Sequence, residues 1–257
     1  MTMGSGNIDY RPDFEGPTPG RRRQCGVSLI ELMVSLALSM VVLLGVIDLF
    51  IAYQHQYRLQ AQLAQVQESG RFVTDVLTRE LRKAGYAEWE KAQTFPATSR
   101  FAQGAVVAGD DSTLRVRYYG STDEPLQDCL GGGLESADIT RATLSLNASQ
   151  GLDCAVDGAS PQPLDANVEA MALRYFVEGR WRRAAGVGDW ASVKGVSIEL
   201  LVASRQNGLV DTASSYVFDG ETVTALDRRL YRVYATSVAL RNVTSLPLAT
   251  AQVETSS

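Results

Sequence analysis

The chain has 257 residues and a formal net charge of −5, with 24 basic and 29 acidic side chains. This length allows one sizeable domain with an appendage, or two small domains. Because a domain that binds nucleic acid normally carries a basic face, the acidic balance argues against nucleic acid as a structural partner. Apolar residues make up 45% of the chain, which is ordinary for a globular protein, but they are unevenly distributed.

The chain opens with a polar stretch, residues 1–20, which is rich in Gly and Pro and shows no periodicity. We expect it to be a disordered cytoplasmic leader. Three arginines follow, Arg21 to Arg23, and an apolar run begins shortly after them. Residues 32–47 contain no charged residue, and Asp48 alone interrupts the run before Tyr53.

Residues 32–53 are predicted to span a membrane. About 20 apolar residues, each rising about 1.5 Å in a helix, cross the core of a bilayer. Three arginines precede this segment and none follows until Arg58. The positive-inside rule therefore predicts a cytoplasmic N-terminus and a C-terminal region outside the cytoplasm.

Ordinary N-terminal signals fit these residues less well. A secretory signal has an apolar region of roughly 7–15 residues followed by a small-residue cleavage site, and this run is longer. A lipoprotein signal needs an apolar region before Cys25, but the residues there are basic and polar. A plain signal anchor leaves Glu31 unexplained, because a carboxylate costs about 2.5–3.5 kcal/mol at mid-bilayer. Glu31 then has a partner or reaches the lipid headgroups.

The order Arg-Arg-Arg-Gln-Cys-Gly-Val-Ser-Leu-Ile-Glu at residues 21–31 resembles the processing site of type IV prepilins. The resemblance implies that prepilin peptidase cuts between Gly26 and Val27, so that residues 1–26 are removed. It also implies N-methylation of Val27, where the family more often has Phe. Glu31 becomes the fifth residue of the mature chain and is implied to pair with the N-terminal amino group of a neighbouring subunit during assembly.

Residues 27–85 are predicted to form one long helix. They contain no proline, and apolar residues recur at helical spacing beyond residue 58. Gly85 follows Arg82 and Lys83, an arrangement typical of a helix C-terminus. A domain of this size cannot cover the whole helix, so its first half is expected to lie in lipid or against other subunits.

Residues 86–257 are predicted to form a β-rich domain outside the cytoplasm. Alternating apolar residues indicate antiparallel strands with one buried face, in runs at residues 114–119, 144–146, 171–177, 196–202 and 230–240. Long loops are expected at residues 86–110, 120–140 and 203–228. The fold class is α+β, pilin-like, with the amphipathic half of the helix packed on an antiparallel sheet.

The cysteines fit a domain outside the cytoplasm. Cys25 leaves with the leader, and Cys129 and Cys154 remain as an even pair, for which we expect a disulfide. Such a bond closes a loop of about 25 residues and contributes roughly 3 kcal/mol in the loop-entropy model. The single histidine, His55, and two distant cysteines make no credible zinc site.

The sequence shows no catalytic constellation. It has no HExxH, no P-loop and no complete GxSxG. The glycines at Gly186 and Gly188 mimic a dinucleotide fingerprint, but charged residues precede them instead of an apolar strand. Trp181 and Trp190 are expected to pack on the sheet rather than to bind a ligand. We therefore predict that the protein is no enzyme, has no cofactor and binds no metal at a dedicated site.

The helix end at residues 79–86 and the closing run at residues 228–242 look like those of PilW-type minor pilins, which are similar to J-type pseudopilins. The resemblance implies a minor pilin that initiates or caps a type IV pilus, with roles in motility and adhesion. Its implied partners are prepilin peptidase, the inner-membrane assembly platform, membrane lipid before assembly, and other minor and major pilins through the N-terminal helix. Its final place would be the extracellular fibre. A type II secretion pseudopilin and a membrane-anchored surface-binding module are the alternatives.

Overall fold

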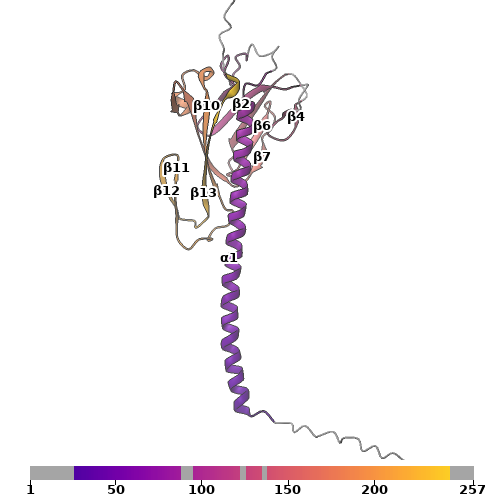
Figure 1. Cartoon of the computed structure of the whole chain (residues 1–257), viewed down its shortest axis with the longest axis vertical. Helices are drawn as coiled ribbons and strands as arrows, with labels where there is room; N and C mark the ends of the chain where they lie inside the picture. Colours follow the sequence, from indigo (N-terminus) through magenta and orange to yellow (C-terminus); the bar gives the residue numbers. More distant parts are fainter. Residues whose placement is uncertain (1–25, 88–94, 122–125, 135–137, 244–257) are drawn as a thin grey trace, which may run out of the picture. The chain divides into compact units, whose positions relative to one another are not determined.

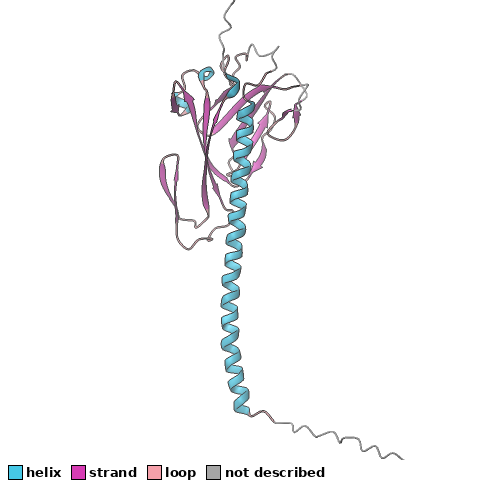
Figure 2. Cartoon of the chain, viewed as in Figure 1, coloured by secondary structure: helices cyan, strands magenta, loops and turns pink. Residues whose placement is uncertain are grey.

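The computed structural model describes residues 26–87, 95–121, 126–134 and 138–243. The predicted leader lies outside the described residues except for Gly26. The chain divides into two compact units, Met1–Ala52 and Tyr53–Ser257. Helix α1 (Leu29–Lys83) contributes to both units, and the described strands belong to the second (Figures 1 and 2). The architecture is α+β, as the sequence predicts.

The second unit contains two antiparallel sheets. One has the strand order β1-β2-β5-β6-β7, with β1 (Val107–Gly109), β2 (Thr113–Tyr119), β5 (Ile139–Leu146), β6 (Leu152–Val156) and β7 (Gln162–Asp165). The other has the order β13-β10-β8-β9, with β8 (Val168–Val177), β9 (Arg180–Arg182), β10 (Gly195–Ala203) and β13 (Tyr231–Ala239). Two ribbons pair β3 (Leu126–Gln127) with β4 (Gly133–Leu134), and β11 (Ser214–Phe218) with β12 (Glu221–Ala225).

The predicted apolar runs all fall on strands, and their alternation sets the core. On β2, Leu114, Val116 and Tyr118 are fully buried. On β8, Leu173 and Tyr175 are buried in the same alternating way. Both sheets and the second half of α1 share one hydrophobic cluster, and Figure 1 shows this part of α1 lying along the strands. The sequence indicated a single sheet, whereas the structure has two that enclose a common core.

The predicted loop at residues 203–228 contains the β11–β12 hairpin, so this part of the prediction is wrong. Asp219 and Gly220 connect the two strands with φ of 52° and 84°. Two consecutive residues with positive φ match a type I′ turn, whose twist suits a two-residue hairpin. The same geometry occurs at Glu178 and Gly179, between β8 and β9. The dipeptide Asp-Gly was the sequence signal for this hairpin.

Alternation on β2 also suggested that Arg117 is exposed, but it is fully buried. Its guanidinium donates hydrogen bonds to the carbonyl oxygens of Ala105 at 2.6 Å, Pro96 at 2.5 Å and Ala102 at 2.9 Å. The ring of Phe101 lies 4.8 Å from the guanidinium carbon. Burial lowers the pKa of Arg117 to about 10. This side chain thus holds the segment before β1 through its carbonyl oxygens.

The C-terminus of α1 is anchored by polar contacts. Gly85 has φ of 77°, which favours glycine after a helix, and its N–H donates to Arg117 O at 2.9 Å. The Asn242 amide nitrogen donates to the carbonyl oxygens of Arg82 at 3.3 Å and Ala84 at 3.1 Å. These bonds satisfy carbonyl groups that the helix itself leaves unpaired.

Near the C-terminus of α1, the buried carboxylate of Glu80 joins the helix to β2. Glu80 is 2% exposed, and it accepts hydrogen bonds from Lys83 Nζ at 2.6 Å and Tyr118 Oη at 3.1 Å. Lys83 also donates to the carbonyl oxygen of Gln127 on β3. Burial raises the pKa of the Glu80 carboxyl above its ordinary value, although the Lys83 ammonium and the Tyr118 hydroxyl favour the charged form.

The disulfide between Cys129 and Cys154 ties the segment that carries this carbonyl group to β6. The two Cα atoms lie 6.4 Å apart. Cys154 is fully buried opposite Leu144 on β5. Because Cys129 follows β3 by two residues, the bond holds the β3–β4 ribbon near Lys83.

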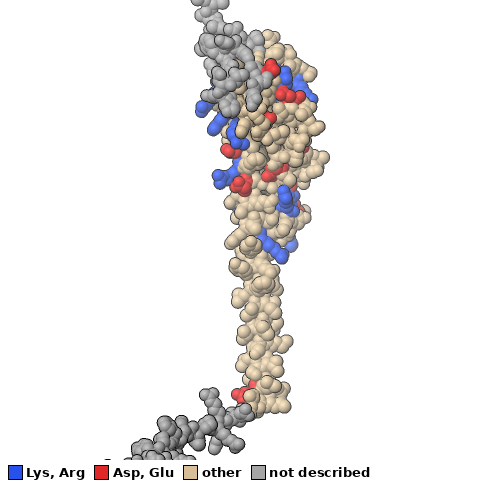
Figure 3. All heavy atoms as spheres, turned by 90° about the vertical axis from the view of Figure 1, so that its right-hand side faces the viewer, with Lys and Arg blue, Asp and Glu red and all other residues tan. Residues whose placement is uncertain are grey.

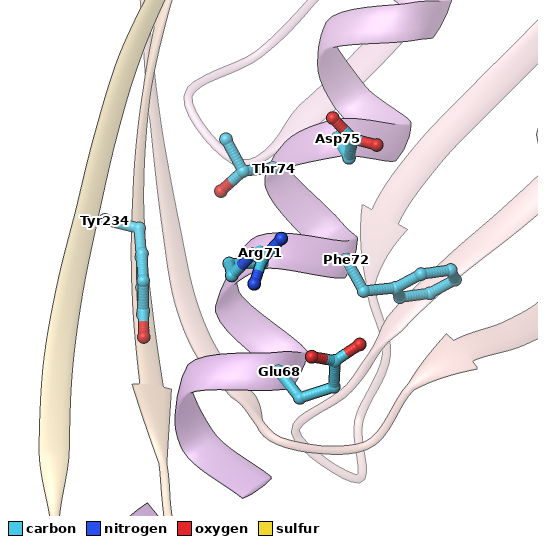
Figure 4. Close-up of a pocket in the computed structure, with 6 residues that line it drawn as sticks. All are labelled: Glu68, Arg71, Phe72, Thr74, Asp75 and Tyr234. Carbon is cyan, nitrogen blue, oxygen red and sulfur yellow. The ribbon is translucent and has the colours of Figure 1, made fainter. Parts of the chain in front are cut away.

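Closer to the middle of α1, the helix approaches β13 so closely that only a glycine fits at position 70. A Cβ added to Gly70 would lie 2.2 Å from ring atoms of Tyr234. The Tyr234 hydroxyl donates to Val66 O at 3.3 Å. A groove of about 430 Å³ opens beside this contact. In Figure 4 Thr74 lies on the side of α1 that faces Tyr234, whereas Phe72 points away from it.

We expect Gly70→Ala to lower the free energy of unfolding by about 1–3 kcal/mol, because the methyl group overlaps the Tyr234 ring and forces α1 and β13 apart. Chemical denaturation of the detergent-solubilised full chain, followed by near-UV circular dichroism, measures the change. Gly45→Ala is the matched control, since nothing lies within 4 Å of a Cβ at that position. Equal stability of the two variants would contradict the close packing.

A second prediction concerns pH. Because folding raises the pKa of Glu80, the folded chain holds this proton more tightly than the unfolded chain does. The contribution of Glu80 to stability is therefore fully present below its unfolded value of 4.5, and it is lost as pH rises through the raised folded value. We expect the wild type to gain stability relative to Glu80→Gln as pH falls from about 7 to about 4.5.

Denaturation curves of both proteins across this pH range give the difference in the free energy of unfolding at each pH. The variant Glu221→Gln serves as the control, because Glu221 is exposed on β12. Its difference from wild type should vary less with pH. If the wild type instead loses stability relative to Glu80→Gln as pH falls, the raised pKa of Glu80 is refuted.

Candidate processing and assembly site

The candidate site is the short stretch before α1 together with its first turn. Gly26, Val27 and Ser28 precede the helix, and all three are exposed. Val27 is 70% exposed, and nothing lies within 4 Å of a Cβ at Gly26. The peptide bond between Gly26 and Val27 is therefore open to an enzyme from several sides. The first helical hydrogen bond runs from Leu32 N to Ser28 O at 3.1 Å.

Glu31 is the acidic residue in the first turn of α1. The N–H groups there have no helical partner, and the helix dipole favours a negative charge in this turn. The Glu31 side chain is exposed, and no described residue pairs with it. This carboxylate is available to a cation from outside the chain.

Two serines on the Glu31 side of the helix satisfy their own polar groups. Ser35 Oγ donates to Leu32 O at 2.9 Å, and Ser39 Oγ donates to Ser35 O at 2.7 Å. Hydroxyl groups bonded to the helix backbone can enter an apolar environment without unpaired donors. Residues 31, 35 and 39 are spaced to share one helix face. These bonds were not predicted from the sequence, although serines in an apolar helix were their signal.

The remainder of this half of α1 is an exposed apolar surface. Large side chains such as Leu29, Phe50 and Ile51 are 76%, 59% and 60% exposed. The apolar stretch has a mean hydropathy of 2.5 and none of it is buried, so by length and composition α1 qualifies as a membrane-crossing helix. On the face shown in Figure 3, charged side chains gather on the β-rich part and few occur on this stretch. Such a surface requires lipid or other helices as cover.

Other candidate residues do not converge on a site. Within the described ranges, no three His, Cys, Asp or Glu side chains are placed to hold a metal ion. Gly186 ends the 3₁₀ turn η1 (Ala184–Gly186), not a strand-to-helix turn that cradles phosphate. His55 is exposed on α1. Trp181 packs against Phe176 in a tilted arrangement and Trp190 packs edge-to-face against Tyr175, with ring centroids 5.1 Å and 4.8 Å apart.

Comparison with known proteins agrees with this arrangement. The model of the prokaryotic N-terminal methylation motif matches residues 21–47, and that of the Type IV Pilus-assembly protein W matches residues 138–242. The pilin-like protein PilA3 of Thermus thermophilus is 26% identical over 155 residues, which span 58% of this chain and 66% of PilA3. A solved type IV-like pilin from Thermus thermophilus is 19% identical, with a TM-score of 0.45 over 72% of this chain and 97% of its own.

The chain is similar to type IV pilin-like proteins, which are structural rather than enzymatic proteins. The resemblance seen in residues 21–31 is confirmed by the match to the methylation motif. The PilW-type character of the closing run is confirmed as well, since residues 138–242 match that family model. The apolar helix fits membrane anchoring.

Proposed function

We propose that this protein is a minor type IV pilin that takes part in initiating the pilus and is incorporated at or near its tip. Prepilin peptidase would cut between Gly26 and Val27 and methylate the new amino group. The observation that carries the proposal is the placement of Glu31 in the first turn of an exposed apolar helix, directly after an open Gly26–Val27 bond. The match of residues 138–242 to the assembly protein W family supports the minor-pilin assignment.

In the proposed assembly step, Glu31 pairs with the Val27 amino group of a neighbouring subunit. Either charge alone is costly in an apolar environment, whereas together they neutralise each other and set the axial register of the two helices. The ammonium group at Val27 exists only after cleavage, because the peptide nitrogen carries no charge before it. Cleavage is therefore a condition for assembly, because it creates the charged amino group with which Glu31 pairs.

The proposal assigns each segment a place. Residues 1–26 form the cytoplasmic leader, residues 32–53 hold the protein in the inner membrane before assembly, and residues 86–257 lie outside. The arginines at residues 21–23 support this orientation. The platform in the inner membrane would then transfer the processed chain into the fibre, where its helix contacts minor and major pilins.

The direct test is mass spectrometry of the N-terminal peptide in sheared surface fibres. We expect a peptide that begins at methylated Val27. The variant Gly26→Val should remain uncut and be confined to membranes, because the β-branched side chain fills the open space at the cleavage bond. If only the uncut N-terminus is found, and only in membranes, the chain is a signal-anchored protein and the proposal fails. A processed chain that appears only with a secretion system indicates a pseudopilin.

A further prediction concerns Glu31. We expect Glu31→Ala to reduce the amount of mature chain in sheared fibres at least fivefold, while cleavage after Gly26 continues, because the neighbouring ammonium loses its partner. Ser35→Ala is the matched control on the same face, since the Ser35 hydroxyl bonds only to its own helix. Quantitative immunoblots of fibre and membrane fractions measure both. Normal incorporation of Glu31→Ala would remove the ion pair from the mechanism.

A further inference from the structure

One charged residue in the apolar half of α1, Asp48, takes no part in the proposed pairing of Glu31 with Val27. Asp48 is the sole Asp, Glu, Lys or Arg between Glu31 and Arg58. Its side chain is exposed, and no described residue forms a hydrogen bond or ion pair with it. An ionisable group within a membrane-spanning segment is costly and usually marks a functional contact. Asp48 therefore requires a partner that the described residues do not supply.

The partner of Glu31 cannot also serve Asp48. Successive residues of an α-helix are rotated by about 100°, so the 17-residue separation places the two carboxylates about 100° apart around the axis. Glu31 shares its face with Ser35 and Ser39, whereas Asp48 lies on another. A helix packed against the first face does not reach the second. The geometry calls for a different neighbour.

Two of the four positions beside Asp48 on the helix surface carry small residues. Gly45 precedes it by three residues and Ala52 follows by four, while Leu44 and Ile51 occupy the other two positions. Nothing lies within 4 Å of a Cβ at Gly45. Because small residues allow the backbones of two helices to approach closely, Gly45 and Ala52 form a notch on either side of the carboxylate. We call these three residues the Asp48 notch.

Lipid headgroups are a poor partner for this carboxylate. Asp48 lies five residues, or about 7.5 Å along the axis, before Tyr53 at the end of the apolar run. Aspartate has a single methylene group, too short to reach the interface from that depth. Lysine and arginine have long stems, so a cation from a neighbouring helix is able to extend into the apolar layer and meet Asp48.

We propose that the Asp48 notch receives a parallel apolar helix from a second pilin-like subunit, which places a lysine or arginine side chain against the Asp48 carboxylate. The charge of Asp48 and the apolar surface around it fit such a partner, and residues 32–57 contain no Lys or Arg of their own. This inference rests on the proposed role as an assembled pilin. It assigns each subunit two separate electrostatic contacts, on two faces of one helix, with two neighbours.

The test compares Asp48→Leu with wild type in cells that produce the full chain and its pilus system. Leucine is better solvated by lipid than aspartate, so a defect of this variant cannot come from poorer membrane insertion. We expect normal cleavage after Gly26 and normal amounts in the membrane, with at least a fivefold loss from sheared fibres. Asp48→Glu should retain most incorporation. Val46→Leu, on the opposite side of the helix, is the control for a change in volume.

Photo-crosslinking identifies the neighbour. A photoreactive residue at Ala52 should form an adduct with a pilin-like chain that carries a basic residue near its apolar helix, or with a second copy through Arg58. Reversing both charges, with Asp48→Lys and aspartate at the partner's basic position, should restore incorporation. Adducts with lipid alone would overturn the inference.

The Glu31→Ala variant separates this inference from the proposed function. If Asp48→Leu enters fibres normally while Glu31→Ala does not, the second contact is refuted and the proposed function stands. If wild type itself never enters fibres, the proposed function fails as well. Loss of both variants from fibres, with normal cleavage of each, supports two contacts.

Discussion

Helix α1 must bury apolar surface against two different kinds of partner, and this constraint governs the molecule. Its second half finds cover within the chain, where Val66, Val73 and Leu77 are fully buried among the strands. Its first half exposes large apolar side chains and finds no cover among the described residues. A chain with such a helix completes its burial only with lipid or with other subunits. The similarity to type IV pilin-like proteins agrees with this requirement.

Carboxylates on the same helix follow one rule in both halves. A negative charge in a low-dielectric environment needs a cation or hydrogen-bond donors close to it. Glu80 receives both from Lys83 and Tyr118 within its own domain. Glu31 and Asp48 receive neither from the described residues. The buried carboxylate of the domain is therefore paired within the domain, whereas the apolar helix offers its two carboxylates to neighbours. In the assembly proposed here, those two charges select and align the subunits.

Contacts between distant segments give the β-rich domain its shape. The Arg117 guanidinium holds the segment before β1 through carbonyl oxygens. The disulfide between Cys129 and Cys154 holds the β3–β4 ribbon beside Lys83. Gly70 allows Tyr234 to lie against α1. Each joins residues far apart in sequence, and together they fix the helix to both sheets at several points.

The sequence by itself determined the long helix, the apolar segment, the processing motif, the buried strands and the cysteine pair. These features are local or periodic. In a helix or a strand, the spacing of apolar residues indicates which face is buried. Only the tertiary structure decided that the strands form two sheets, that Arg117 is buried and that Gly70 adjoins Tyr234. Periodicity records which face of an element is buried, but not which distant segment covers it. The Asp219-Gly220 hairpin lies between these cases, since its turn signal was present in the sequence but its flanking strands are largely exposed and lack a clear apolar alternation.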